Sequence, residues 1–288
     1  MRWRGRRQST NVEDRRGMRV GRRGIAGGGI GIVAILLIGM ALGVDPGVLL
    51  RGVQTMNAGG PAVEDTGPYQ ETAAEAERRE FISVVLADTE SVWHGLFGQL
   101  GGRYREPRLV LFSGAVDSGC GFAEAAMGPF YCPPDERVFI DLSFFDELAG
   151  GLGAAGDFAQ AYVLAHEVGH HVQNLLGTSG EVQQMRQRAG PSESNALSVR
   201  LELQADCYAG VWAHHAERMQ HILEQGDVEE ALGAASAVGD DRLQRQAQGY
   251  VVPDSFTHGS SAQRMRWFRQ GLQSGELAAC DTFAASDL

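Results

Sequence analysis

The sequence predicts an α+β fold that is mostly helical with a small sheet and is preceded by one transmembrane helix. Apolar residues recur at helical spacing in several stretches after residue 71, whereas only RLVLF (108–112) and RVFIDL (137–142) have the composition of strands. A stretch of twenty uncharged residues, 25–44, is long enough to cross a bilayer as a helix. With 43% hydrophobic and 21% charged residues, the 288-residue chain otherwise has the composition of a globular protein.

Charge is distributed unevenly along the chain. All 25 basic residues are arginines, and nine of them lie in residues 1–24 against only Glu13 and Asp14, which gives this segment a net charge of +7. The rest of the chain carries −18, for a total of −11. An acidic body repels phosphate, so we expect no nucleic-acid partner. We interpret residues 1–24 as a basic cytoplasmic tail.

The apolar stretch 25–44, IAGGGIGIVAILLIGMALGV, is interpreted as an uncleaved membrane anchor. Arginines before a transmembrane helix stay in the cytoplasm, so the following domain is expected to be periplasmic or extracellular. A cleaved signal peptide is the alternative, but its apolar run is usually shorter and is followed by a small-x-small cleavage site. Two glycine pairs match the small-xxx-small pattern and suggest a transmembrane-helix dimer: Gly27/Gly31 and Gly39/Gly43.

Residues 45–70 are rich in glycine and proline and are expected to form a linker to a domain spanning 71–288. A helix begins near Glu71, and its apolar side extends to Phe97. The first of the later elements is a nearly uncharged and therefore buried helix over 158–176 that ends at Gly177. A polar, loop-like stretch over 178–194 follows, with room for one helical turn. The remaining elements are a helix from 195 to beyond 212 and helices over 227–247 and 260–273, the last of them capped by Ser260 or Ser261.

The four cysteines are consistent with an exported domain. Cys120 and Cys132 flank a short loop and are expected to form a disulfide, which leaves Cys207 to pair with Cys280. A cysteine metal site is the alternative, but the sequence contains no C-x-x-C pair.

The segment HEVGHH (166–171) contains the pattern H-E-x-x-H. Residues four apart lie on the same face of a helix, so His166 and His170 can bind one metal ion together. Glu167 lies beside them and can act as the general base that takes a proton from a zinc-activated water and delivers it to the leaving amine. His171 points about 100° away from His170, so it is expected to pack or to support the ligands. Gly169 allows another backbone to approach closely.

A catalytic zinc ion needs three protein ligands and one open position. Residues 173 and 176 are Gln and Leu, which excludes the third histidine of metzincins. Among the downstream glutamates, Glu202 is distinguished by an aspartate four residues later, Asp206, which is expected to accept the free N–H of a ligating histidine. The apolar surroundings of Glu202 favour a metal-bound or paired carboxylate, the alternative being an ordinary ion pair with an arginine such as Arg200. We therefore expect one Zn²⁺ bound by His166, His170 and Glu202.

Four segments together resemble the bacterial predicted neutral zinc metallopeptidase family: HEVGHHVQ, RLELQADCYAGVWA, SGC…GPFYCP with VFIDLSFF, and HGSSAQRMRWF. The resemblance covers residues 70–285 in order, and it implies a zincin-like fold, a peptidase activity, an N-terminal membrane segment and an exported domain. The combination of HExxH with ExxxD is also similar to gluzincins such as the CAAX-type and heat-shock metalloproteases.

By analogy with zincins, RVFIDL is expected to be the edge strand that lines the cleft and to pair with an extended peptide. The oxyanion of the reaction needs a stabilising group, and His258, Tyr208 and Tyr250 are the candidates. The expected function is that of a membrane-anchored zinc peptidase, an endopeptidase acting on peptide or protein substrates. The alternatives are a catalytically silent zinc-containing binding module of the cell envelope and a zinc amidase acting on cell-wall peptides.

Overall fold

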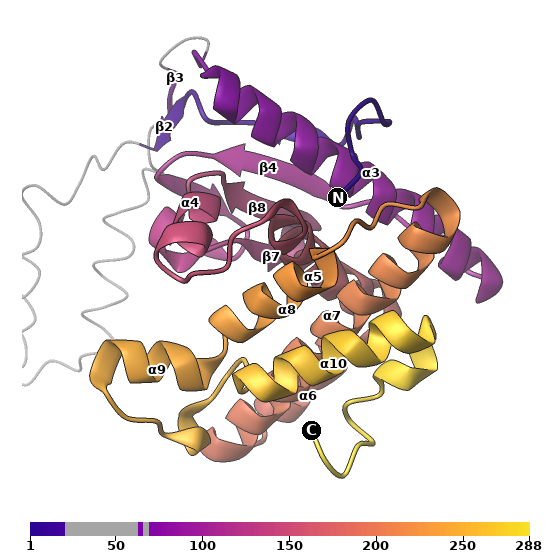
Figure 1. Ribbon diagram of the computed structural model, residues 1–288. Helices are drawn as coiled ribbons and strands as arrows, with labels where there is room; N and C mark the ends of the chain where they lie inside the picture. The colour runs from indigo at the N-terminus through magenta and orange to yellow at the C-terminus, as the bar shows by residue number, and fades with distance from the viewer. Residues whose placement is uncertain (21–62, 66–68) are drawn as a thin grey trace, which may run out of the picture.

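The computed structural model describes residues 1–20, 63–65 and 69–288. The expected transmembrane helix, 25–44, and most of the expected linker lie outside the described residues. Among the helices that are described, none combines the length and the apolar character that a membrane crossing requires. The described residues form an α+β structure with one four-stranded sheet, two strand pairs and a larger set of helices (Figure 1).

The four-stranded sheet has the strand order β1-β4-β8-β7. Its strands are β1 (Val12–Asp14), β4 (Arg108–Phe112), β8 (Arg137–Asp141) and β7 (Phe130–Cys132). β4 is parallel to both β1 and β8, whereas β7 is antiparallel to β8, with Phe130 opposite Phe139. The expectation that RVFIDL is an edge strand is wrong, because β7 folds back through a turn at Pro133–Asp135 and covers that side of β8.

Side chains alternate between the two faces of this sheet, as the period of a strand requires. Leu109, Leu111, Val138 and Ile140 belong to the main core shared with the helices. Val110, Phe112 and Phe139 lie on the other face and pack in a second cluster with Val116 and Ala123. These last two residues come from the antiparallel pair β5 (Ala115–Ser118) and β6 (Gly121–Glu124). One face of the sheet is therefore covered by helices and the other by a short hairpin.

The helices of the described part are α3 (Ala73–Gln99), α4 (Phe144–Gly150), α5 (Asp157–Leu176), α6 (Thr178–Arg186), α7 (Pro191–Gln220), α8 (Asp227–Ala237), α9 (Asp240–Gln248) and α10 (Ser261–Ser274). Figure 1 shows α7 and α10 side by side, with α5 between them and the sheet. Capping boxes begin α3, at Thr72 with Glu75, and α10, at Ser260 with Gln263. The sequence correctly predicted both of these helices, and Ser260 is the cap of α10, one of the two serines expected there.

Two expectations about the helices are wrong. The stretch 178–194, expected to be a loop with at most one helical turn, contains the nine-residue helix α6. Helix α7 already begins at Pro191, since proline is favoured in the first helical turn. The expected helix 227–247 is divided into α8 and α9 next to Gly239. A Cβ atom at Gly239 would lie 2.4 Å from the backbone nitrogen of Ser261, so the division brings the chain against the start of α10.

Residues 1–20, which we expected to be a tail apart from the domain, lie against it. Met1 and Trp3 are each only 6% exposed, and β1 extends the main sheet. β2 (Met18–Val20) then pairs with β3 (Val63–Asp65) in an antiparallel pair. The N-terminal segment is therefore part of the folded body in the described residues.

Both expected cysteine pairs are joined as disulfides, Cys120 with Cys132 and Cys207 with Cys280. The first joins the turn between β5 and β6 to the end of β7. The second ties the C-terminal end of the chain to the middle of α7.

Candidate metal centre and active site

The candidate site lies where α5 crosses α7. Gly169 of α5 makes this crossing close, because a Cβ atom there would lie 2.9 Å from the carbonyl oxygen of Ala205 in α7. This contact agrees with the close backbone approach expected at Gly169. It brings the HExxH face of α5 against the Glu202–Asp206 face of α7.

His166, His170 and Glu202 are brought together, and each offers a ligand atom within 4.8 Å of the others. The Nε2 atom of His166 lies 3.2 Å from one carboxylate oxygen of Glu202, and the Nε2 atom of His170 lies 3.4 Å from the other. The side chains of His170 and Glu202 are 16% and 18% exposed, so the group is partly accessible to solvent. The expected three metal ligands therefore converge, with both Nε2 atoms facing Glu202.

The Nδ1 atoms of the two histidines are engaged on the other side. Asp206 Oδ1 lies 2.8 Å from Nδ1 of His166, as the sequence led us to expect, and Gln173 Oε1 lies 2.8 Å from Nδ1 of His170. A carboxylate only accepts hydrogen bonds, so Nδ1 of His166 carries the proton. Nε2 of His166, and likewise Nε2 of His170, is thereby left to bind a metal.

Asp206 is completely buried and is held by two further residues. Arg264 of α10 donates to it from Nε at 2.8 Å and from Nη2 at 2.9 Å, and the Tyr162 hydroxyl also donates to it. Burial works against the charge of Asp206, but Arg264 and His166 outweigh it and lower its pKa. The acceptor of His166 is therefore fixed in position and ionised.

The electrostatics of the group favour a cation. Burial alone would lower the pKa of His166, yet the carboxylates of Asp206 and Glu202 raise it to about 10. The pKa of His170 is also raised against burial, chiefly by Glu202. In turn, His170 and His166 hold the pKa of Glu202 well below its usual range despite burial. A site that stabilises positive charge on one buried and one partly buried histidine, with two nitrogens and a carboxylate converging, fits Zn²⁺.

Glu167 is 8% exposed and lies next to the ligands on α5. Among the described residues, no hydrogen bond or ion pair engages its carboxylate, although its charge contributes to the raised pKa of His170. A carboxylate without a structural partner beside a metal site is available to exchange protons.

The three candidates for oxyanion stabilisation have different surroundings. Tyr208 is buried against Trp93, and burial raises its pKa to about 12. Tyr250 is 63% exposed after α9. Among the described residues, none of the three makes a hydrogen bond or ion pair with His166, His170 or Glu202. The charge of Glu202 nevertheless contributes to the raised pKa of His258, after the larger effect of Asp240.

His171 has a packing role. It is fully buried, and its ring nitrogens lie 3.0 Å from the Tyr131 hydroxyl and 2.6 Å from the carbonyl oxygen of Arg105. These contacts fix α5 to β7 and to the segment before β4.

Sequence reasoning missed three residues of the site: Tyr162, Gln173 and Arg264. Tyr162 and Gln173 had a signal, because they lie four residues before His166 and three after His170 and thus on the same helix face. Arg264 had no such local signal beyond its place in the HGSSAQRMRWF segment, because it lies 58 residues away from its partner Asp206 in the sequence.

A second group of carboxylates lies at the start of α5 and comprises Asp157, Asp227 and Glu230. The amino group of Met1 lies 2.9 Å from Asp157 and 3.3 Å from Asp227. Glu230 accepts the backbone N–H of Phe158 and so caps α5. These acidic groups therefore have structural partners, and we assign them no metal.

Comparison with known proteins is consistent with this geometry. Residues 1–283 match the model of the family described as "Putative neutral zinc metallopeptidase". "Uncharacterized protein YpfJ" of Escherichia coli K12 is 50% identical over 294 aligned residues, which cover 99% of this chain and all of the relative. "Uncharacterized protein Rv2575" of Mycobacterium tuberculosis is 44% identical over 263 residues, 86% of each chain. No solved structure shows significant similarity. The chain therefore belongs to the neutral zinc metallopeptidase family.

Proposed function

We propose that this protein is a zinc-dependent peptidase that hydrolyses peptide bonds, with His166, His170 and Glu202 as ligands. The observation that carries the proposal is the convergence of both Nε2 atoms on Glu202, next to a carboxylate, Glu167, that has no structural partner among the described residues. A binding module needs ligands alone, whereas a hydrolase also needs a base.

Zinc bound by these residues would supply a Lewis acid that polarises a carbonyl group and lowers the pKa of water. Glu167 accepts the proton of the attacking water and delivers it to the departing amine nitrogen, so that one carboxylate acts first as base and then as acid. Asp206, oriented by Arg264 and Tyr162, keeps the proton of His166 on Nδ1. Gln173 has the same role for His170.

His258 is proposed to stabilise the negative charge that develops on the carbonyl oxygen. A protonated imidazole is a donor that acts where charge develops, which is the requirement for such a group. Its ring contacts Thr257 and Asp240, so it is held at the loop before α10.

The proposal is tested on the full-length protein by measuring zinc content and casein cleavage in the same samples. We expect Glu167→Gln to keep about one zinc per chain, because Glu167 is not a ligand, and to lose at least about 100-fold in cleavage rate. Glu193→Gln, an exposed glutamate of α7, is the matched control and should behave like wild type. Glu202→Ala should lose zinc.

Zinc in wild type and in Glu167→Gln, with no cleavage in either, would replace the peptidase by a silent zinc-binding module. Cleavage of cell-wall peptides but not of casein would identify an amidase instead. Full activity in Glu167→Gln would refute the assigned base.

We further propose that the domain is exported and attached to a membrane through residues 25–44. The support is the uncharged stretch itself and the two disulfides, which persist in oxidising compartments. Retention of the full chain in membranes after alkaline washing is the expected result, and release of the chain into the soluble fraction would contradict attachment.

A further inference from the structure

Helix α3 is buried around its whole circumference over residues 81–90. A helix on the surface of a domain normally buries one stripe and exposes the opposite face. One side of α3 contacts α5 and α7. The burial of the remaining side, which includes Ser83, Asp88 and Glu90, requires a second covering layer.

Residues 1–20 provide that layer through apolar and backbone contacts. The ring of Trp3 packs edge-on against Phe81, with centroids 5.4 Å apart. The backbone N–H of Ser9 donates to the carbonyl oxygen of Ser83 at 2.9 Å. Strand β1 then pairs with β4 in parallel over three residues. The segment is thus fixed by the main sheet as well as by α3.

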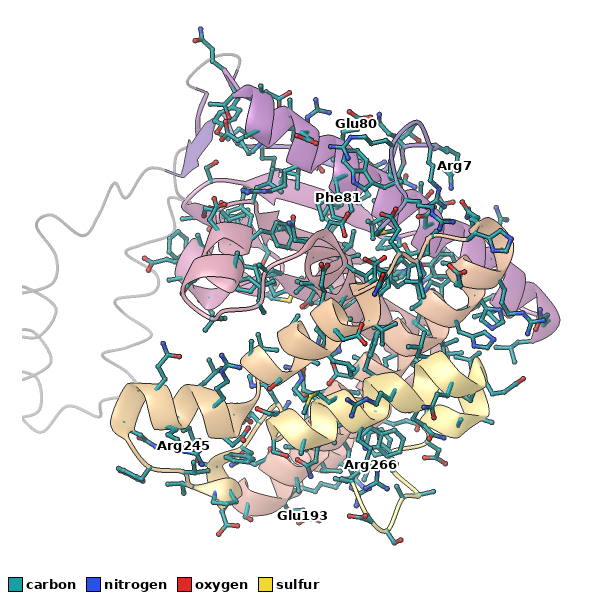
Figure 2. The ribbon with its side chains drawn as sticks, viewed as in Figure 1. Arg7, Glu80, Phe81, Glu193, Arg245 and Arg266 are labelled. Carbon is teal, nitrogen blue, oxygen red and sulfur yellow. A yellow bond between two sulfur atoms is a disulfide. The ribbon has the colours of Figure 1, made fainter. Side chains whose placement is uncertain are left out.

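The arginines of this segment form ion pairs with the body. Arg6 Nη2 lies 2.7 Å from Oδ1 of Asp88, and Arg7 Nη1 lies 3.0 Å from Oε2 of Glu90. The two carboxyl groups are only 5% and 3% exposed. Figure 2 shows Arg7 beside α3, the helix that carries Phe81. Because buried carboxylates need partners, these arginines have a structural reason to be there.

The residues on either side of the stretch 21–62 lie next to each other in the structure. Val20, the last residue of β2, is opposite Val63, the first residue of β3. The two ends of the stretch 21–62 are therefore neighbours in one strand pair. This follows from the backbone register and does not depend on any side chain.

From these contacts we infer that residues 1–20 and the domain formed by residues 69–288 lie in the same compartment, as one folded unit. A single crossing by residues 25–44 would separate them by a bilayer, which the β1–β4 pairing and the ion pairs of Arg6 and Arg7 with the buried carboxyl groups of α3 exclude. The N-terminal arginines then bind α3 and are not the cytoplasmic flank of a single-pass anchor. The inference is independent of the zinc chemistry.

The test uses two full-length variants, each with one free thiol. Gln8 and Glu193 are exposed residues of the N-terminal segment and of α7, and the four native cysteines are joined in disulfides. Spheroplasts of a bacterium that expresses Gln8→Cys or Glu193→Cys are treated with a membrane-impermeant maleimide, before and after permeabilisation. Labelling of detergent-solubilised protein confirms that both thiols react.

We expect both thiols to behave alike, with labelling of both before permeabilisation. Labelling of one thiol only before permeabilisation would overturn the inference and restore a single-pass topology. Labelling of both only after permeabilisation would support a shared compartment and contradict export, so the two proposals fail separately.

A second measurement tests the docking itself in the purified full chain. Trp3→Ala should lower the Tm by several degrees and speed tryptic cleavage after Arg16, whose side chain is 2% exposed. Met127→Ala, at a residue that is 72% exposed, is the control and should change neither. Unchanged Tm and cleavage in Trp3→Ala would show that the segment is not docked in solution.

Discussion

His166 and His170 each have one ring nitrogen engaged by a partner and the other directed at Glu202. The four-residue spacing on a helix predicted that the two histidines share a face, and the ExxxD pair identified Glu202 and Asp206. Arg264 could not be predicted, because nothing local in the sequence shows which distant arginine neutralises Asp206. Local sequence patterns thus predict the residues that we propose as ligands, whereas tertiary packing determines what holds them.

Arg264→Gln is expected to weaken zinc binding by about 10- to 100-fold, because Asp206 loses its buried counter-ion and no longer orients His166 reliably. Arg264→Lys should recover part of the lost zinc affinity, because it restores the charge but not the bidentate contact with Asp206. The measurement is the zinc Kd by competition with a chelator. Equal affinity in Arg264→Gln and wild type would assign Arg264 to packing alone.

The activity should fall on the alkaline side as His258 loses its proton. The hydrogen bond with Asp240 is the largest cause that raises the pKa of His258 above 6.5, so the protonated form persists below the raised pKa and disappears as the pH rises through it. His258→Asn should lower kcat/KM by about 100-fold. Asp240→Asn removes the charge and should move the alkaline fall to lower pH. An identical pH profile in Asp240→Asn would indicate that His258 is not the group that stabilises the oxyanion.

At the scale of elements, apolar periodicity predicted the long helices, and capping residues predicted the start of α10. The strands were predicted less well, because β7 has only three residues and its pairing with β8 depends on a turn. Because β8 lies inside the sheet, the edge strand next to it is β7. Strand β7 also contacts α5.

The crossing of α5 and α7 depends on the absence of a side chain at Gly169. Gly169→Ala places a Cβ atom 2.9 Å from the carbonyl oxygen of Ala205 and should cost about 1–3 kcal/mol of unfolding free energy. Gly180→Ala in α6 is the control, since a Cβ atom there has no neighbour within 4 Å, and should be neutral or slightly stabilising. Chemical denaturation of both variants gives the comparison. Equal stability of the two variants would mean that α5 and α7 move apart at little cost to accommodate the added methyl group.

At the scale of the molecule, the composition predicted an acidic exported body with two disulfides, but it did not predict where the basic residues act. A cluster of arginines before an apolar stretch has the same composition whether it stays in the cytoplasm or pairs with carboxylates of the same chain. The partners Asp88 and Glu90 lie inside a helix pattern and have no distinctive sequence signal. Only the three-dimensional contacts separate the two interpretations.

The two disulfides should differ in their effect on the stability of the whole domain. Cys207–Cys280 closes a span of 73 residues and Cys120–Cys132 a span of 12. Loop-closure entropy predicts a loss of about 4 kcal/mol for Cys207→Ser with Cys280→Ser, and about 3 kcal/mol for the shorter pair. Denaturant unfolding of both double variants measures the difference. The reverse order would show that packing around the shorter loop outweighs chain entropy.

The docked N-terminal segment also has a consequence for the order of folding. Arg6 and its partner Asp88 are 82 residues apart in the chain, and the amino group of Met1 is 156 residues from Asp157. Residues 1–20 therefore take their final place only after α3, β4 and the start of α5 have been synthesised. Until then their arginines and Trp3 are free for other contacts, so the nascent chain presents a basic, aromatic segment that the folded protein conceals.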